Sequence, residues 1–221
     1  MASTAQPNPA GPAPANAAAR PIGRGFRFRG FVGGFFLGPA LVCTLLSQPM
    51  VPRGSGLDLL CDAVAWVLFI AGVVFRIWPT LYIGGRKRFS LVTEGPYSIC
   101  RNPLYFGSFL LGLSAACFLK SPFFASLLIV VAVWYTLKTL PEEEKDLAQI
   151  IGPDYTEYCR TVPRFFPRFS QFRSSDNVSL RVHGLHTEAL RAVVWIWIPL
   201  AGEVISFLRA ESWWPHVFRH L

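Results

Sequence analysis

The sequence predicts an all-α integral membrane protein, a polytopic bundle of about five transmembrane helices. Two observations indicate this class. Hydrophobic residues make up 52% of the 221 residues and charged residues only 15%, whereas soluble domains carry roughly 25% charged residues. The apolar residues also gather in five runs, as expected of helices that cross a bilayer. This composition excludes a free soluble domain, and it excludes disorder for most of the chain.

The chain begins with an uncharged tail that is rich in Ala, Pro and Asn and ends at Arg20. Arginines and phenylalanines then alternate up to Arg29. Because the positive charges follow the tail, it is not a signal peptide, and the basic-aromatic segment is typical of an interfacial anchor. We therefore predict a disordered tail and anchor at 1–30, followed by a single membrane domain at 31–221.

Five apolar runs follow, at 31–47, 57–78, 104–119, 122–140 and 192–208. A span needs roughly 20 apolar residues, so the first, third and fifth runs are near the short limit. Only Lys120 and Ser121 separate the third run from the fourth, which predicts a tight helical hairpin.

Basic residues predict the orientation. Fifteen Lys and Arg residues lie in the N-terminal tail, in the loop after the second run and in the stretch 141–191, whereas four lie on the opposite side. Under the positive-inside rule, the N-terminus and both long polar segments face the cytoplasm. Arginine outnumbers lysine 17 to 4, which by association favours a bacterial inner membrane.

Charge and cysteines bear on partners. The net charge of +8 favours an anionic membrane surface, and no nucleic acid is expected as a partner. The five cysteines lie far apart without a CxxC pair, so we predict neither a metal site nor a disulfide framework. The sequence does not indicate an oligomeric state.

The first polar segment leads into the third run. Gly95-Pro96 is typical of a turn, and Asn102-Pro103 places Pro103 at the first position of a helix. Arg101 and Asn102 then lie at a helix N-terminus, where backbone N–H groups favour an anionic ligand. An interfacial cap with a snorkelling arginine is the alternative interpretation.

The second polar segment opens with Glu142-Glu143-Glu144, directly after the fourth run. The hairpin predicts that these glutamates lie near Asn102 and Tyr105. A carboxylate beside a basic helix N-terminus can bind a zwitterion. A solvated acidic helix start is the alternative.

Together these motifs resemble the isoprenylcysteine carboxyl methyltransferase and phospholipid methyltransferase family. The resemblance covers about residues 82–168 and rests on Gly-Pro-Tyr-x3-Arg-Asn-Pro-Leu-Tyr-x-Gly and Glu-Glu-x2-Leu-x4-Gly-x2-Tyr-x2-Tyr-x3-Val-Pro-Arg. It implies a membrane methyltransferase that uses S-adenosylmethionine at the cytoplasmic membrane face. A lipophilic acceptor would enter from the bilayer, among membrane lipids.

The resemblance also implies the site residues. Its cofactor contacts fall on Tyr82, Phe89, Ser90, Leu91, Val92, Tyr97, Asn102, Pro103, Leu104, Tyr105 and Glu143. We assign Glu144, Arg101 and Arg164 as candidate catalytic residues.

Two positions depart from the family. Asn102 replaces its histidine, so this position would bind and not transfer protons. Thr139, with Lys138 beside it, replaces an arginine that holds the substrate carboxylate, which predicts a different acceptor. Two other functions stay open: a non-catalytic lipid-binding or scaffold protein of the same fold, and an NADPH-dependent sterol-reductase-like enzyme, which Tyr155–Pro163 resembles.

Overall fold

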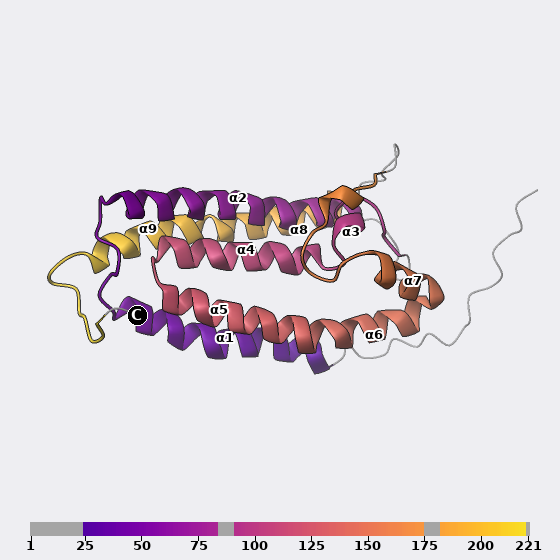
Figure 1. The fold of residues 1–221 in the computed structure, drawn as a ribbon, viewed down its shortest axis with the longest axis horizontal. Coiled ribbons are helices and arrows are strands. Elements are labelled where there is room, and N and C mark those ends of the chain that lie inside the picture. The colour runs from indigo at the N-terminus through magenta and orange to yellow at the C-terminus, as the bar shows by residue number, and fades with distance from the viewer. Residues whose placement is uncertain (1–23, 84–90, 175–181, 220–221) are drawn as a thin grey trace, which may run out of the picture.

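The computed structural model describes residues 24–83, 91–174 and 182–219, without the side chains of 24–32 and 182–185. The described part is helical (Figure 1). Its α-helices are α1 (Arg24–Leu45), α2 (Gly56–Ile83), α3 (Pro96–Ile99), α4 (Pro103–Phe118), α5 (Pro122–Trp134), α6 (Leu140–Ile151), α7 (Pro153–Thr161), α8 (Val182–Trp195) and α9 (Trp197–Arg209). A π-helical turn, Tyr135–Thr139, joins α5 to α6, and a 3-10 turn lies at Phe169–Gln171.

The long helices make five antiparallel passes, arranged in two rows (Figure 1). One row holds α2, α4 and the α8–α9 pair, and the other holds α1 with α5 and α6. The start of α1, the end of α2, the short helices α3 and α7 and the start of α8 all lie at one end of the bundle. We call this the motif end, because both polar segments lie there, and the opposite end the far end. The predicted all-α membrane bundle and its tight α4–α5 hairpin are therefore confirmed.

The helix lengths differ from the predicted runs. Three helical stretches are long and apolar enough to cross a membrane: Gly56–Ile83, Pro122–Ile151 and His186–Arg209. Gly33–Leu45 and Pro103–Phe118 are shorter apolar helices. The last pass starts at Val182 and not at 192, because Glu188 lies inside the bundle, where it pairs with Arg76 of α2.

The fourth pass also continues beyond its predicted end at residue 140. Leu140 donates its N–H to the carbonyl of Tyr135, a π-type bond that keeps the helix intact immediately before Pro141. A proline in a helix interior removes a backbone donor, and π turns accommodate such breaks in the hydrogen-bond ladder. The helix consequently runs unbroken to Ile151 and carries the three glutamates on a rigid support.

Small residues bring α2 and α4 into close contact. A Cβ atom on Gly107 would lie 2.9 Å from the backbone carbon of Phe75 and 3.0 Å from the carbonyl oxygen of Gly72. Near the far end, Ser114 donates a 2.8 Å hydrogen bond to the carbonyl of Ala65. Close backbone approach through small residues is typical of membrane helix pairs, and here it fixes the helix that carries Asn102 and Tyr105.

Polar contacts join the helices at the far end. Arg209, which is 1% exposed, donates to the carbonyl of Leu119 at 2.7 Å and to the hydroxyl of Ser47 at 2.9 Å. Lys120 pairs with Asp58 at 2.5 Å and with Asp62 at 2.9 Å. These contacts tie α2, the α4–α5 turn and α9 together.

The α2–α4 contact predicts a stability effect. Gly107→Ala should destabilise the protein by about 1–3 kcal/mol, because the new methyl group meets backbone atoms that cannot rotate away. Thermal unfolding in detergent measures the change. Gly34→Ala is the matched control, since nothing lies within 4 Å of its Cβ position, and it should leave the midpoint unchanged or slightly higher. Equal midpoints for the two variants would contradict the close contact.

Candidate active site

Glu144 lies at the centre of a buried charge cluster at the motif end. Glu144 is only 9% exposed. One carboxylate oxygen lies 3.1 Å from Nη1 of Arg101 and 2.9 Å from Nη2 of Arg164, and Nε of Arg164 donates to both oxygens, at 3.0 and 3.2 Å. A buried carboxylate needs such partners to offset its lost hydration. The three candidate catalytic residues are therefore brought together, and Glu144 holds both arginines.

Asn102 connects this cluster to the start of α4. It is the N-cap residue, with Pro103 at the first helical position, but its side chain does not cap the helix. Instead, Nδ2 donates to the carbonyl of Arg164 at 3.0 Å and lies 3.5 Å from Glu144. The N-terminus of α4 thus keeps its partial positive charge for an anionic group.

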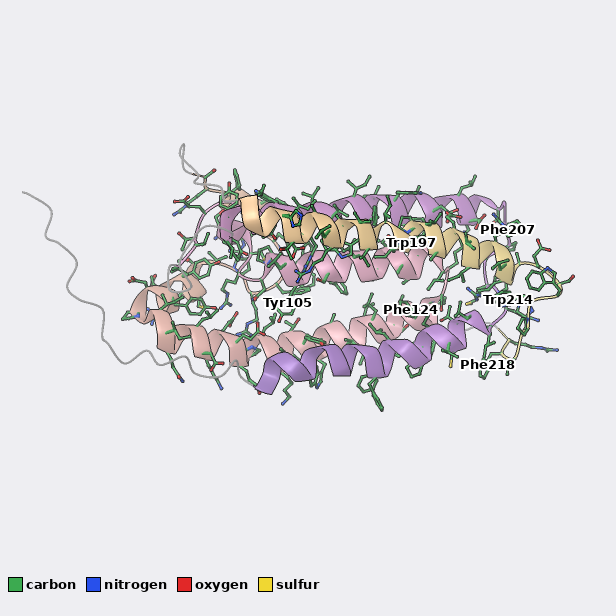
Figure 2. The ribbon with its side chains drawn as sticks, turned by 180° about the vertical axis from the view of Figure 1, so that it is seen from behind. Tyr105, Phe124, Trp197, Phe207, Trp214 and Phe218 are labelled. Carbon is green, nitrogen blue, oxygen red and sulfur yellow. The ribbon has the colours of Figure 1, made fainter. Side chains whose placement is uncertain are left out.

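Glu143 faces a different partner. The hydroxyl of Tyr105 donates to its two carboxylate oxygens at 2.9 and 3.2 Å, and Figure 2 shows Tyr105 projecting from α4 toward the row that holds α5 and α6. The ring of Tyr105 also lies beside Tyr135 of the π turn, with centroids 6.5 Å apart. The hairpin prediction that placed the glutamates near Asn102 and Tyr105 is confirmed by these distances.

The other predicted cofactor residues lie around α3. Tyr82, at the end of α2, packs against Gly95, where a Cβ would lie 2.3 Å from the Tyr82 ring; Gly95 has φ +59°, which also favours glycine. Val92 and Tyr97 are buried, at 9% and 8% exposure.

The remaining four positions are placed as follows. Leu91 is partly buried and Leu104 lies in the first turn of α4, whereas Phe89 and Ser90 lie outside the described residues. The cofactor role of these positions stays a prediction.

Tyr97 is buried beside α7. Tyr158 of α7 donates a 2.7 Å hydrogen bond to the carbonyl of Tyr97. The hydroxyl of Tyr97 is buried and has no hydrogen-bond partner among the described residues. Burial raises the pKa of both tyrosines, so they stay protonated at neutral pH.

An irregular segment after α7, Val162–Arg173, which includes the 3-10 turn, lies across the first motif, and we call it the strap. Pro163 and Pro167 interrupt helix formation here. The strap is held by backbone hydrogen bonds to the motif: Arg101 N–H to Pro163 at 2.9 Å, Arg168 N–H to Ile99 at 2.9 Å and Gly95 N–H to Arg173 at 2.7 Å.

Cys100 lies beneath the strap. Its thiol donates to the carbonyl of Phe165 at 3.0 Å, its residue is fully buried, and burial raises the pKa of this thiol to about 12. The sequence analysis did not predict the strap; its two prolines and its spaced phenylalanines are the signal that could have indicated an ordered, irregular segment.

A second ion pair joins α2 to α8. Arg76 of α2 lies 3.0 Å from Glu188 of α8. It also donates to Ser108 at 3.3 Å and lies over the ring of Trp195, 5.2 Å from its centroid. Arg76 thus joins α2 to α8 through Glu188 and to α4 through Ser108.

A cavity of about 630 Å³ opens beside the motif, between the 91–98 segment, α7 and residues 171–174. Glu94, Asp154 and Glu157 give its lining an acidic character. Neither Tyr105 nor Glu143 lines it.

Comparison with known proteins finds similarity to membrane methyltransferases. The model of the phospholipid methyltransferase family matches residues 60–154, which include Arg101, Asn102, Tyr105 and both paired glutamates. The chain is also 36% identical over 77 residues to protein-S-isoprenylcysteine O-methyltransferase B of Arabidopsis thaliana, covering 35% of the chain and 39% of that protein. The chain is thus similar to phospholipid methyltransferases over residues 60–154 and to an isoprenylcysteine O-methyltransferase over about a third of its length.

Two further relatives of the chain are metal-resistance proteins. The chain is 31% identical over 142 residues to the nickel-cobalt-cadmium resistance protein NccN of Alcaligenes xylosoxydans xylosoxydans, covering 64% of the chain and 66% of that protein. It is 37% identical over 109 residues to the cobalt-zinc-cadmium resistance protein CzcN of Cupriavidus metallidurans, covering 49% and 50%. The matches thus span two thirds or less of each relative. No solved structure matches the chain significantly.

The Glu144 cluster predicts a local opening effect. Glu144→Gln should raise the alkylation rate of Cys100 by at least about tenfold, because losing the buried pairs weakens the strap and each ~1.4 kcal/mol of opening free energy is tenfold. Peptide mass spectrometry quantifies Cys100 separately from the other cysteines. Glu142→Gln, an exposed neighbour, should change nothing. A folded Glu144→Gln protein with the wild-type rate would show that this carboxylate does not hold the strap.

Proposed function

We propose that the protein is an S-adenosylmethionine-dependent methyltransferase that acts on a lipophilic acceptor at the cytoplasmic membrane face. The observation that carries the proposal is the contact between Tyr105 and Glu143, at 2.9 Å, beside the uncapped N-terminus of α4. The similarity to phospholipid and isoprenylcysteine methyltransferases supports it. The excess of Lys and Arg in the segments at the motif end supports a cytoplasmic location under the positive-inside rule.

The residues at this end fit the cofactor's groups. A carboxylate such as Glu143 can accept from ribose hydroxyls or from an ammonium. The N-terminus of α4 favours a carboxylate, and the face of Tyr105 can contact a sulfonium. The donor set therefore offers a partner to each charged part of a zwitterionic methyl donor.

The protein's part in the reaction is positioning. When bound, the sulfonium supplies a methyl group that is already activated. Tyr105 and Glu143 orient the donor, while the apolar faces of α4 and α5 accept a lipophilic molecule and exclude water, which aligns the two reactants. Asn102 contributes hydrogen bonds and no proton, and Glu144 keeps Arg101 and Arg164 in place.

The acceptor is proposed to be an amine-bearing or neutral lipophilic molecule. Thr139 is 7% exposed and uncharged, and the neighbouring Lys138 is exposed. Both nearby arginines already pair with Glu144. Thr139 therefore offers no charge to a substrate carboxylate, whereas the resemblance to the isoprenylcysteine enzymes implies an arginine at this position.

The similarity to two metal-resistance proteins favours a contribution to metal resistance as a second candidate. This candidate does not compete with methyl transfer, since it describes a cellular outcome and methyl transfer describes a reaction.

Cofactor binding tests the proposal directly. Calorimetric titration of detergent-solubilised protein should show binding of S-adenosylmethionine. Glu143→Gln and Tyr105→Phe should each weaken it by about 1–3 kcal/mol, because each orphans a partner in the site. Glu142→Gln is the matched control and should bind as the wild type does. Binding of NADPH instead would support the reductase alternative, and binding of neither would support a scaffold.

Acceptor choice gives a second test. The wild type should methylate amine-bearing or neutral lipids better than farnesylcysteine, and Thr139→Arg should raise turnover of farnesylcysteine by about 10- to 100-fold, the effect of one ionic hydrogen bond. Lys138→Arg is the control and should have no effect, because Lys138 is exposed whereas Thr139 is buried. Strong wild-type turnover of farnesylcysteine that Arg164→Ala abolishes would instead identify Arg164 as the carboxylate ligand.

A further inference from the structure

The outer surface of the strap is aromatic and basic. Phe166, Phe169 and Phe172 are 72%, 65% and 51% exposed, and the side chains of Arg168 and Arg173 are exposed between and beside them. Soluble surfaces rarely expose three large rings so close together.

The strap lies alongside the bundle and not beyond its end. The ring of Phe169 lies 6.3 Å from Phe75, and that of Phe172 lies 5.9 Å from Trp78. Phe75 is about two helical turns before the end of α2 at Ile83. Phe165 similarly packs against Phe109 in the second turn of α4, at 5.8 Å. The strap therefore lies at the depth where these apolar helices leave the membrane.

We propose that the strap is a lipid-binding element that seats on anionic phospholipids of the leaflet at the motif end. Phenylalanine rings at this depth enter the boundary between headgroups and acyl chains, while arginine side chains extend to phosphate groups. Basic residues near such a surface are attracted to anionic lipids. Charge complementarity and depth thus indicate the same occupant, the bilayer surface itself.

This binding would bear on the candidate site. The strap holds the Gly95–Arg101 segment through backbone hydrogen bonds, and Arg164 of the strap pairs with Glu144. Lipid that seats the strap therefore also supports the position of Arg101. The inference depends on the placement of the strap at the membrane and not on methyl transfer.

Photocrosslinking in vesicles tests the contact. A benzoylphenylalanine at position 166, in vesicles of phosphatidylcholine and phosphatidylglycerol, should give lipid adducts on irradiation. Position 197 is the positive control, because Trp197 is 60% exposed on α9 (Figure 2), and position 157 on α7, where Glu157 is exposed, is the negative control. Adducts to protein, or no adducts at 166 while 197 reacts, would overturn the proposal.

The charge preference is tested with a matched pair of variants. In nanodiscs that offer both lipids, phosphatidylglycerol should be enriched around the protein, and Arg168→Gln with Arg173→Gln should lower its binding by about fivefold for each arginine. The strap stays in place, because its hydrogen bonds to Ile99 and Gly95 come from backbone atoms. Arg160→Gln, which removes an exposed arginine of α7, should leave the preference unchanged. Equal preferences in all three proteins would reject lipid recognition by the strap.

Discussion

The candidate site depends on one buried carboxylate. Glu144 brings together three segments that are distant in sequence: the end of the fourth pass, the Arg101–Asn102 turn and the strap. Burying a carboxylate without partners costs far more than a folded protein can tolerate, so the two arginines and the segments that carry them must close around it. The geometry of the first motif is consequently set by a residue of the second.

Glu143 and Glu144 divide two roles because a helix separates neighbours by about 100°. Glu144 points to the arginines and stabilises the fold, whereas Glu143 points to Tyr105 and faces the proposed cofactor site. The π turn before Pro141 sets this rotation, since an inserted residue in the ladder changes which face every later side chain presents. The π turn thus determines which of the two glutamates faces Tyr105 and which faces the arginines.

Much of this arrangement could be predicted from the sequence. Apolar runs and the short Lys120-Ser121 turn predicted the passes and the hairpin, and the hairpin placed Glu143 beside Tyr105. The sequence could not show that the helix passes through Pro141, because a proline normally ends a helix. It also could not show the partners of Glu144 and Arg76, since these contacts join residues that only tertiary packing brings together. The strap escaped prediction for the same reason: besides the two bonds of its own 3-10 turn, it is held by backbone hydrogen bonds to the distant first motif.

The two ends of the bundle are stabilised differently. At the far end, Arg209, Lys120 and their partners join helices directly across short turns. At the motif end, longer segments also join the helices. One of them, the strap, is held by backbone hydrogen bonds to the first motif, by contacts with Ser98, Cys100 and Asn102 and by the Glu144 cluster. Local opening requires breaking the contacts of the opening unit alone, so the strap can separate from the first motif while the far end holds the helices in register. A site that must admit a polar cofactor and a lipophilic acceptor needs an end of the bundle that can open locally. Because the proposed position of the strap is on the lipid side, the membrane surface helps to keep this end closed.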